Sequence, residues 1–233
     1  MSSAMSIAVS RDTSSRRDTS RRDPSRQELA ADCAIHILGI AAGSVGGATL
    51  VALIAARGDW LELGALLIYA ISMIAMFSFS AAYNLARNSR WRATLRRCDH
   101  AAIFVMIAGT YTPFTLLRLD GVWSWGLTTA VWTIAGAGML IKLCRRCDLR
   151  YASAAPYLLL GWIGLIAIDP LFRSLGWETL GLIGVGGALY MIGVGFHVWE
   201  RLPFQNAIWH AFVLAAASVH YAAVVYGVVL RGT

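Results

Sequence analysis

Residues 96–118 read RRCDHAAIFVMIAGTYTPFTLLR. A polar cluster opens this stretch, and residues 101–117 then contain no charged side chain. An α-helix rises about 1.5 Å per residue, so an apolar run of nearly 20 residues crosses the roughly 30 Å hydrocarbon core of a bilayer. The stretch therefore predicts a transmembrane helix over 100–118, with Asp99 and His100 at its start.

Further apolar runs of the same kind divide most of the remaining chain. The sequence is 58% hydrophobic and only 14% charged, whereas soluble domains carry about 25% charged residues. The predicted fold class is therefore all-α, a bundle of seven transmembrane helices, in which Asp169 and Pro170 end the short fifth span. The predicted spans are 31–56, 61–84, 100–118, 122–142, 152–168, 178–199 and 206–230.

Arginine residues predict the orientation of this bundle. They gather in the N-terminal tail, in the loop between the second and third spans and in the loop between the fourth and fifth spans. Because basic loops stay on the inner side of a membrane, the N-terminus is predicted to be cytoplasmic and the C-terminus outside, in an integral protein of the cell membrane. The basic residues are scattered between spans, so the net charge of +7 indicates topology, and nucleic acid is not an expected partner.

Residues 1–24 differ in composition from the rest of the chain. They repeat a short Arg-Arg-Asp-Ser/Thr theme and have no apolar core. Such a segment is predicted to be a disordered cytoplasmic tail that lies against anionic lipid headgroups. Residues 25–233 are predicted to form the membrane domain, and Ser25 with Glu28 fits a capping box that starts the first helix.

Polar residues lie at one end of the predicted spans, within or bordering the apolar runs. Threading the chain through the bilayer brings them all near the cytoplasmic face, and ionisable groups at that depth usually face a shared interior or a water-filled cavity. Each residue alone has a structural explanation, such as a helix cap for an Asp or interhelical hydrogen bonding for a His or an Asn. Their common depth predicts a buried polar chamber. The residues are Asp32, His36, Asn84, Asp99, His100, His197, Asn206 and His210.

Four segments resemble the hemolysin III family. RRCDHAAIFVMIAGTYTPF at 96–114 is similar to the family signature, and ELAADCAIHILG at 28–39 resembles its first-helix motif. SFSAAYN at 78–84 and ERLPFQNAIWHAFVLAAASVHY at 200–221 resemble its second-helix and closing motifs. The family belongs with the progestin and adiponectin receptors and is distantly similar to alkaline ceramidases. The resemblance implies a seven-helix bundle with a cytoplasmic N-terminus.

The resemblance also implies an intramembrane zinc site. Its ligands in the family are three histidines, one ending the second helix and a His-x-x-x-His pair on the seventh, while an aspartate on the third helix holds a metal-bound water. In this sequence Asp99 matches the aspartate, His210 the second histidine of the pair, and Ser80 the motif serine. Asn84 and Asn206 stand where the other two histidines belong. An amide oxygen is a weak zinc ligand, so no zinc or only weakly bound zinc is expected. Instead, Asn84 and Asn206 are expected to bridge Asp99 and His210 by hydrogen bonds.

Three functions follow as hypotheses. The first is a membrane protein of the hemolysin III type with a degraded zinc site, which acts in membrane homeostasis or sensing and has membrane lipids as partners. The second is a zinc-dependent intramembrane hydrolase of lipid amides or esters, with Asp99 as general base and Ser80 in support. The third is a pore-forming cytolysin, which the high hydrophobicity disfavours because a self-inserting toxin needs a soluble form. Whether the protein is an enzyme therefore stays open at this point.

Overall fold

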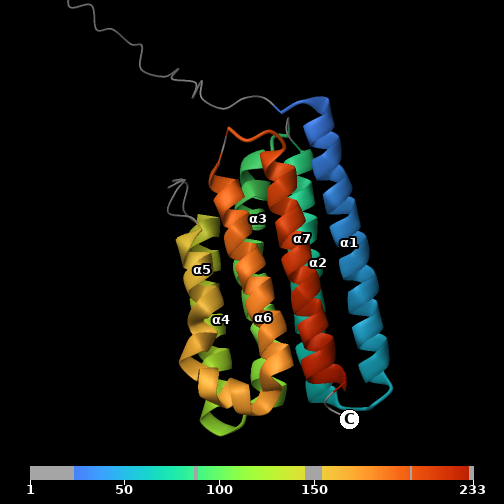
Figure 1. Cartoon of the computed structure of the whole chain (residues 1–233). Helices are drawn as coiled ribbons and strands as arrows, with labels where there is room; N and C mark the ends of the chain where they lie inside the picture. The colour runs from blue at the N-terminus through green and yellow to red at the C-terminus, as the bar shows by residue number, and fades with distance from the viewer. Residues whose placement is uncertain (1–23, 87–88, 145–153, 200, 231–233) are drawn as a thin grey trace, which may run out of the picture.

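The computed structural model describes residues 24–86, 89–144, 154–199 and 201–230, and over these ranges it is entirely helical (Figure 1). Six helical stretches are long and apolar enough to cross a membrane, and the fifth of these, Ala155–Val198, joins several elements. The predicted helical membrane fold is therefore confirmed. The number of crossings, seven, and their direction stay predictions. The nature of the N-terminal tail also stays a prediction, because residues 1–23 lie outside the described ranges. The elements are α1 (Arg26–Ala55), α2 (Trp60–Leu85), α3 (Arg92–Arg118), α4 (Gly121–Cys144), α5 (Ala155–Trp162), η2 (Ile163–Ala167), α6 (Ile168–Val198), α7 (Gln205–Val224) and η3 (Val225–Leu230).

The region around the predicted fifth and sixth spans differs from the prediction. α5 has only eight residues and continues as the 3-10 helix η2. Asp169 and Pro170, predicted to end a span, lie instead in the first turn of α6. Proline is tolerated there because the first amides of a helix have no partner within it. The interruption falls at Gly176, whose φ of 73° lies in the left-handed region that glycine adopts without steric cost.

The start of α1 is fixed by the predicted capping box, which also ties it to α7. The Ser25 amide donates to Glu28 Oε2 at 2.6 Å, and the Glu28 amide donates to Ser25 Oγ at 3.2 Å. Glu28 Oε1 in turn accepts from the Phe204 amide at 2.8 Å, directly before α7. Farther along, the Tyr221 hydroxyl donates to the Gly46 carbonyl at 3.0 Å. These contacts hold α1 beside α7, and both helices begin at the same end of the bundle (Figure 1).

The start of α3 corrects one prediction. The helix begins at Arg92, about two turns before the expected position. Asp99 therefore lies within α3 and does not cap it, because only the first few amides of a helix lack an intrahelical partner. Its carboxyl group is available for contacts with neighbouring helices.

Tyrosine hydroxyls attach α5 and η2 to α3. The Tyr111 hydroxyl donates to the Gly161 carbonyl at 2.6 Å and accepts from the Gly164 amide at 3.0 Å. The Tyr157 hydroxyl donates to the His100 carbonyl at 3.1 Å. These hydrogen bonds hold α5 and η2 against α3.

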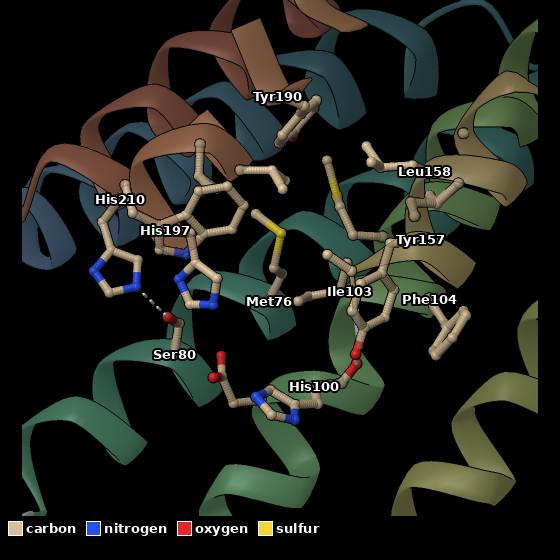
Figure 2. A pocket seen from close by; sticks show the side chains of 18 of the residues that line it. Met76, Ser80, His100, Ile103, Phe104, Tyr157, Leu158, Tyr190, His197 and His210 are labelled. Carbon is tan, nitrogen blue, oxygen red and sulfur yellow. Dashed lines mark hydrogen bonds between the residues drawn. The ribbon is translucent and has the colours of Figure 1, made fainter. Parts of the chain in front are cut away.

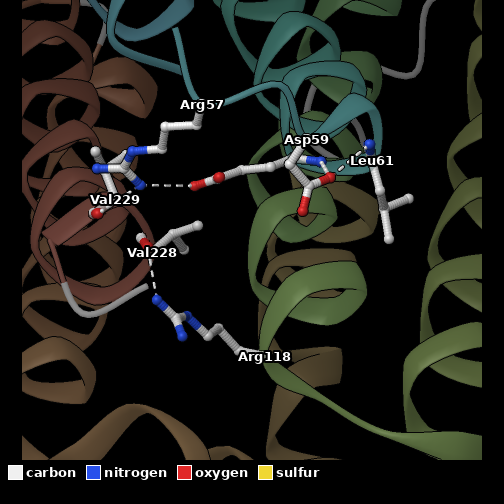
Figure 3. A network of polar contacts seen from close by, with 7 residues as sticks. Arg57, Asp59, Leu61, Arg118, Val228 and Val229 are labelled. Carbon is white, nitrogen blue, oxygen red and sulfur yellow. Dashed lines mark hydrogen bonds and ion pairs between the residues drawn. The ribbon is translucent and has the colours of Figure 1, made fainter. Parts of the chain in front are cut away.

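The opposite end of the bundle is closed by two arginines (Figure 3). Arg57 Nη1 donates to the Val229 carbonyl at 3.1 Å, and Arg118 Nη2 donates to the Val228 carbonyl at 2.6 Å. Both carbonyls belong to the end of η3, where the last carbonyl oxygens of a helix have no partner within it. The arginines thus attach the end of the last helix to the loop that follows α1 and to the last turn of α3.

Candidate functional site

A chamber of about 940 Å³ lies between the helices, and all seven α-helices and η2 contribute to its wall. Much of that wall is apolar, including Met76, Ile103 and Leu158, which Figure 2 shows around a common space. All eight polar residues that the sequence placed at one depth line it. The structure thus places these side chains around one chamber.

A compact cluster of Asp32, His36 and His210 forms the centre of the polar part. His210 Nδ1 lies 2.5 Å from Asp32 Oδ1, and His36 Nε2 lies 3.7 Å from Asp32 Oδ2. The rings of the two histidines are 4.3 Å apart between centroids. The side chains are exposed by only 8% for Asp32, 3% for His36 and 11% for His210. Three groups that ionise or bind metals are therefore held together away from bulk water.

Helix geometry explains why α1 contributes two members of this cluster. Asp32 and His36 are four residues apart, so their side chains share one face of α1. His210 is in the second turn of α7. The contacts of Glu28 with Phe204 and of Tyr221 with Gly46 hold these two helix faces against each other.

Ser80 and Asp99 extend the cluster toward α2 and α3. Ser80 Oγ lies 3.5 Å from His210 Nε2 (Figure 2). The Asp99 carboxyl group is within hydrogen-bonding reach of the Ser80 side chain. It also interacts electrostatically with the His210 imidazole. The order of groups is therefore carboxylate, imidazole, hydroxyl, with a second carboxyl group beside the hydroxyl.

One of the two asparagines, Asn84, has a different hydrogen bond from the one that the sequence predicted. Asn84 Nδ2 donates to the Ser80 carbonyl of its own helix at 2.9 Å. The partner of His210 is Asp32 from α1, which the expected network of α2, α3 and α7 did not include. Asp32 and His36, whose four-residue spacing repeats that of Asn206 and His210, were predicted to line the chamber, but their contact with His210 was not predicted.

Two further histidines of the chamber have contacts of their own on α6 and α7. His197 belongs to the last turn of α6, where its ring is 5.0 Å from the ring of Trp209 between centroids. His220 Nε2 lies 3.2 Å from the Ile183 carbonyl, deeper between α6 and α7. These residues contribute to the wall and to helix packing.

The zinc ligand set implied by the resemblance does not fit this chain. Asn84 and Asn206 offer amide groups in place of imidazoles, and the Asn84 amide is engaged with its own backbone. Catalytic zinc sites commonly have three strong protein ligands and a water. Of the three positions that carry zinc ligands in the family, only position 210 supplies an imidazole here, so these positions do not form a catalytic zinc site.

Long apolar helices that surround a polar chamber define a helical integral membrane protein. A profile of the family described as "Haemolysin-III related" matches residues 30–221, so the chain belongs to the hemolysin III family. It is 36% identical over 159 residues to "Hemolysin-3" of Bacillus cereus, covering 68% of this chain and 73% of that protein.

Further relatives extend across more of the chain. It is 32% identical over 200 residues to "Hemolysin-3 homolog" of Bacillus subtilis (strain 168), covering 86% of this chain and 94% of the relative. It is 29% identical over 203 residues to "Monocyte to macrophage differentiation factor" of Homo sapiens, covering 84% of this chain and 83% of the relative. The similarity therefore includes almost the entire helical region.

Proposed function

We propose that this protein binds one lipid-like molecule in its chamber and acts in the sensing or maintenance of the membrane state. The observation that supports this proposal is the chamber itself. Its volume of about 940 Å³ is at the upper end of the range for small-molecule sites. Its largely apolar wall suits an acyl chain, and the Asp32, His36 and His210 cluster suits the polar group of a lipid.

The rim of the chamber supports a lipid as the occupant. Arg92, Arg96, Arg97 and Lys142 line the chamber at the ends of α3 and α4. Basic groups at a membrane surface attract anionic lipid headgroups. A lipid whose headgroup lies near this rim would extend its apolar part along Met76, Ile103 and the neighbouring wall.

Filling the chamber is expected to weaken lipid binding. Gly184 lines the chamber, and a Cβ added there would meet no atom within 4 Å. A phenylalanine at this position occupies part of the space without displacing a neighbouring helix. We expect Gly184→Phe to raise the Kd for 1-palmitoyl lysophosphatidylcholine about tenfold or more, measured by native mass spectrometry on delipidated full-length protein.

Gly181→Phe is the matched control. Gly181 is on the same helix, its added Cβ also meets no atom within 4 Å, and it is not part of the chamber wall. We expect this variant to bind one lipid with unchanged affinity. Two results would contradict the chamber as the binding site. One is an equal affinity for the lipid in the parent and both variants, and the other is a number of bound lipids per protein that rises without saturating.

Hydrolysis of a lipid amide or ester is a second candidate, which the line of Asp32, His210 and Ser80 favours. With Nδ1–H of His210 donating to Asp32, Nε2 carries a lone pair that faces the Ser80 hydroxyl at 3.5 Å. Catalytic pairs are often this loose before substrate binds. Ser80 Oγ would attack the carbonyl carbon and pass its proton to His210, which returns it to the departing nitrogen or oxygen. Water would then release the acyl group as a fatty acid and restore the Ser80 hydroxyl.

Ser80→Ala tests this activity. If Ser80 is the nucleophile, we expect the rate of fatty acid release from a short-chain ceramide or an acyl ester to fall at least about a hundredfold. Ser72→Ala is the control, because Ser72 is on the same helix, its hydroxyl donates to the Ile68 carbonyl, and it lies outside the chamber wall. Hydrolysis that survives in Ser80→Ala, or an absence of hydrolysis in the parent protein, would exclude this candidate and leave lipid binding untouched.

A further inference from the structure

The geometry points to a relocated metal site, in which Asp32, His36 and His210 bind one zinc ion in place of the ligand set used elsewhere in the family. Two of the three donors come from α1 and the third comes from α7. This inference does not depend on lipid binding. While the ion is bound it excludes the Ser80 mechanism above, because His210 Nδ1 then ligates the ion and Nε2 carries the proton. The inference depends on the donor atoms, on their burial and on the contacts that hold the two helices together.

The donor atoms are close enough for a single ion. One ligand atom from each residue lies within 4.8 Å of the others. Zinc–nitrogen and zinc–oxygen bonds of about 2.0–2.2 Å place the ligands of a tetrahedral site roughly 3.4 Å apart. The separation of 3.7 Å between His36 Nε2 and Asp32 Oδ2 is already near that value. His210 Nδ1 and Asp32 Oδ1, at 2.5 Å, share a proton in the metal-free form and would move apart by about 1 Å when the ion replaces it.

His36 provides an independent indication of a ligand. Its Nε2 atom is buried and has no hydrogen-bond partner among the residues that the structure describes, and the residue is only 2% exposed. A buried polar atom without a partner is costly, and in native proteins it commonly marks an absent ion or water. The atom lies beside Asp32 and the ring of His210, so an ion among the three residues would satisfy it.

The surroundings of His210 also suit a metal ligand. If Nδ1 binds the ion, Nε2–H points at Ser80 Oγ, 3.5 Å away, and can donate to it. Such an outer hydrogen bond fixes the tautomer and orientation of a ligating histidine. The Glu28 contact with the Phe204 amide holds the start of α1 against the start of α7 before any metal binds.

The donor set indicates zinc bound with an open position. Two imidazoles and one carboxylate are the ligands of a known class of catalytic zinc sites, which keep a further position for water or substrate. Bound there, zinc would supply a Lewis acid at the polar end of the chamber. The chain thereby replaces the two imidazoles lost at positions 84 and 206 with a carboxylate and an imidazole from the neighbouring helix.

The test is zinc binding by the full-length protein in detergent micelles. The protein is stripped with a chelator, titrated with zinc against a competing chelator, and its metal content is measured by elemental mass spectrometry. We expect one zinc per chain, and a Kd that rises at least about a hundredfold in Asp32→Asn, His36→Gln and His210→Gln. Asn84→Ala, Asn206→Ala and His197→Gln serve as controls that we expect to retain the affinity of the parent.

Three results would overturn the relocated site. The first is an absence of stoichiometric zinc in the parent protein. The second is a loss of zinc affinity in Asn84→Ala or Asn206→Ala without a loss in His36→Gln. The third is stoichiometric iron that zinc does not displace. Because substitutions in a buried cluster can impair folding, His36→Cys provides a second measurement. A cysteine that ligates cobalt(II) gives a thiolate-to-metal charge-transfer band, so we expect that band in this variant and its absence would count against His36 as a ligand.

Discussion

Histidines at positions 84 and 206 are expected to restore a zinc site of the family type in a chain that has lost the relocated one. In the background Asp32→Asn with His36→Gln, the added changes Asn84→His and Asn206→His supply two imidazoles near His210. If each imidazole contributes at least about 2 kcal/mol, zinc affinity rises by roughly three powers of ten. Competition titration with a chelator of known affinity measures the gain.

The shared ligand provides the control for this experiment. His210 is required in both arrangements, so adding His210→Gln is expected to abolish the restored site. The spacing supports the design, because residues 206 and 210 share one face of α7 and Asn84 lies one turn beyond Ser80, which is 3.5 Å from His210. If the two histidines leave zinc affinity unchanged, Asn84 and Asn206 do not face a common point with His210.

Gly109→Val is expected to lower the stability of the bundle markedly. A Cβ at Gly109 on α3 would lie 2.4 Å from Ser72 Oγ and 2.6 Å from Ser72 Cβ on α2. Ser72 Cβ is attached directly to the backbone and cannot rotate away, so the two helices must separate. Overpacking of this kind costs about 1–3 kcal/mol or more. Thermal unfolding in micelles, followed by circular dichroism, should show a Tm lower by several degrees.

Gly136→Val on α4 is the matched control. Its added Cβ would meet no atom within 4 Å, so the same change in chemistry occurs without a steric conflict. Its unfolding temperature is expected to remain close to that of the parent. Equal effects of the two substitutions would indicate that α2 and α3 do not approach as closely as described. Small residues are a common means of bringing membrane helices together.

In the relocated site, α1 supplies two of the three proposed metal ligands. In the ligand set implied by family resemblance, the second, third and seventh helices carry the chemistry. In this chain Asp32 and His36 place α1 at the centre, and Ser80 and Asp99 lie behind His210 on the far side. Substitutions on the Asp32 and His36 face of α1 should therefore affect metal binding as strongly as substitutions at His210.

The sequence alone determined the class of the protein and predicted which polar residues line the chamber. Apolar runs in 31–56, 100–118 and 206–230 are long enough to cross a bilayer, and hydropathy is a local property that a sequence reports directly. The Ser25 and Glu28 capping box is equally local, and the structure contains it. The segment 96–114 carried the family resemblance, which the match over residues 30–221 confirms.

Only the tertiary structure decided which polar groups meet. Sequence spacing shows that Asp32 and His36 share one face of a helix, but not which neighbouring helix that face contacts. That depends on how α1 is rotated against α7, which the Glu28 contact with Phe204 and the Tyr221 contact with Gly46 fix across more than a hundred residues of chain. The partner of His210 is therefore Asp32, because long-range packing and not local pattern sets the rotation of each helix in the bundle.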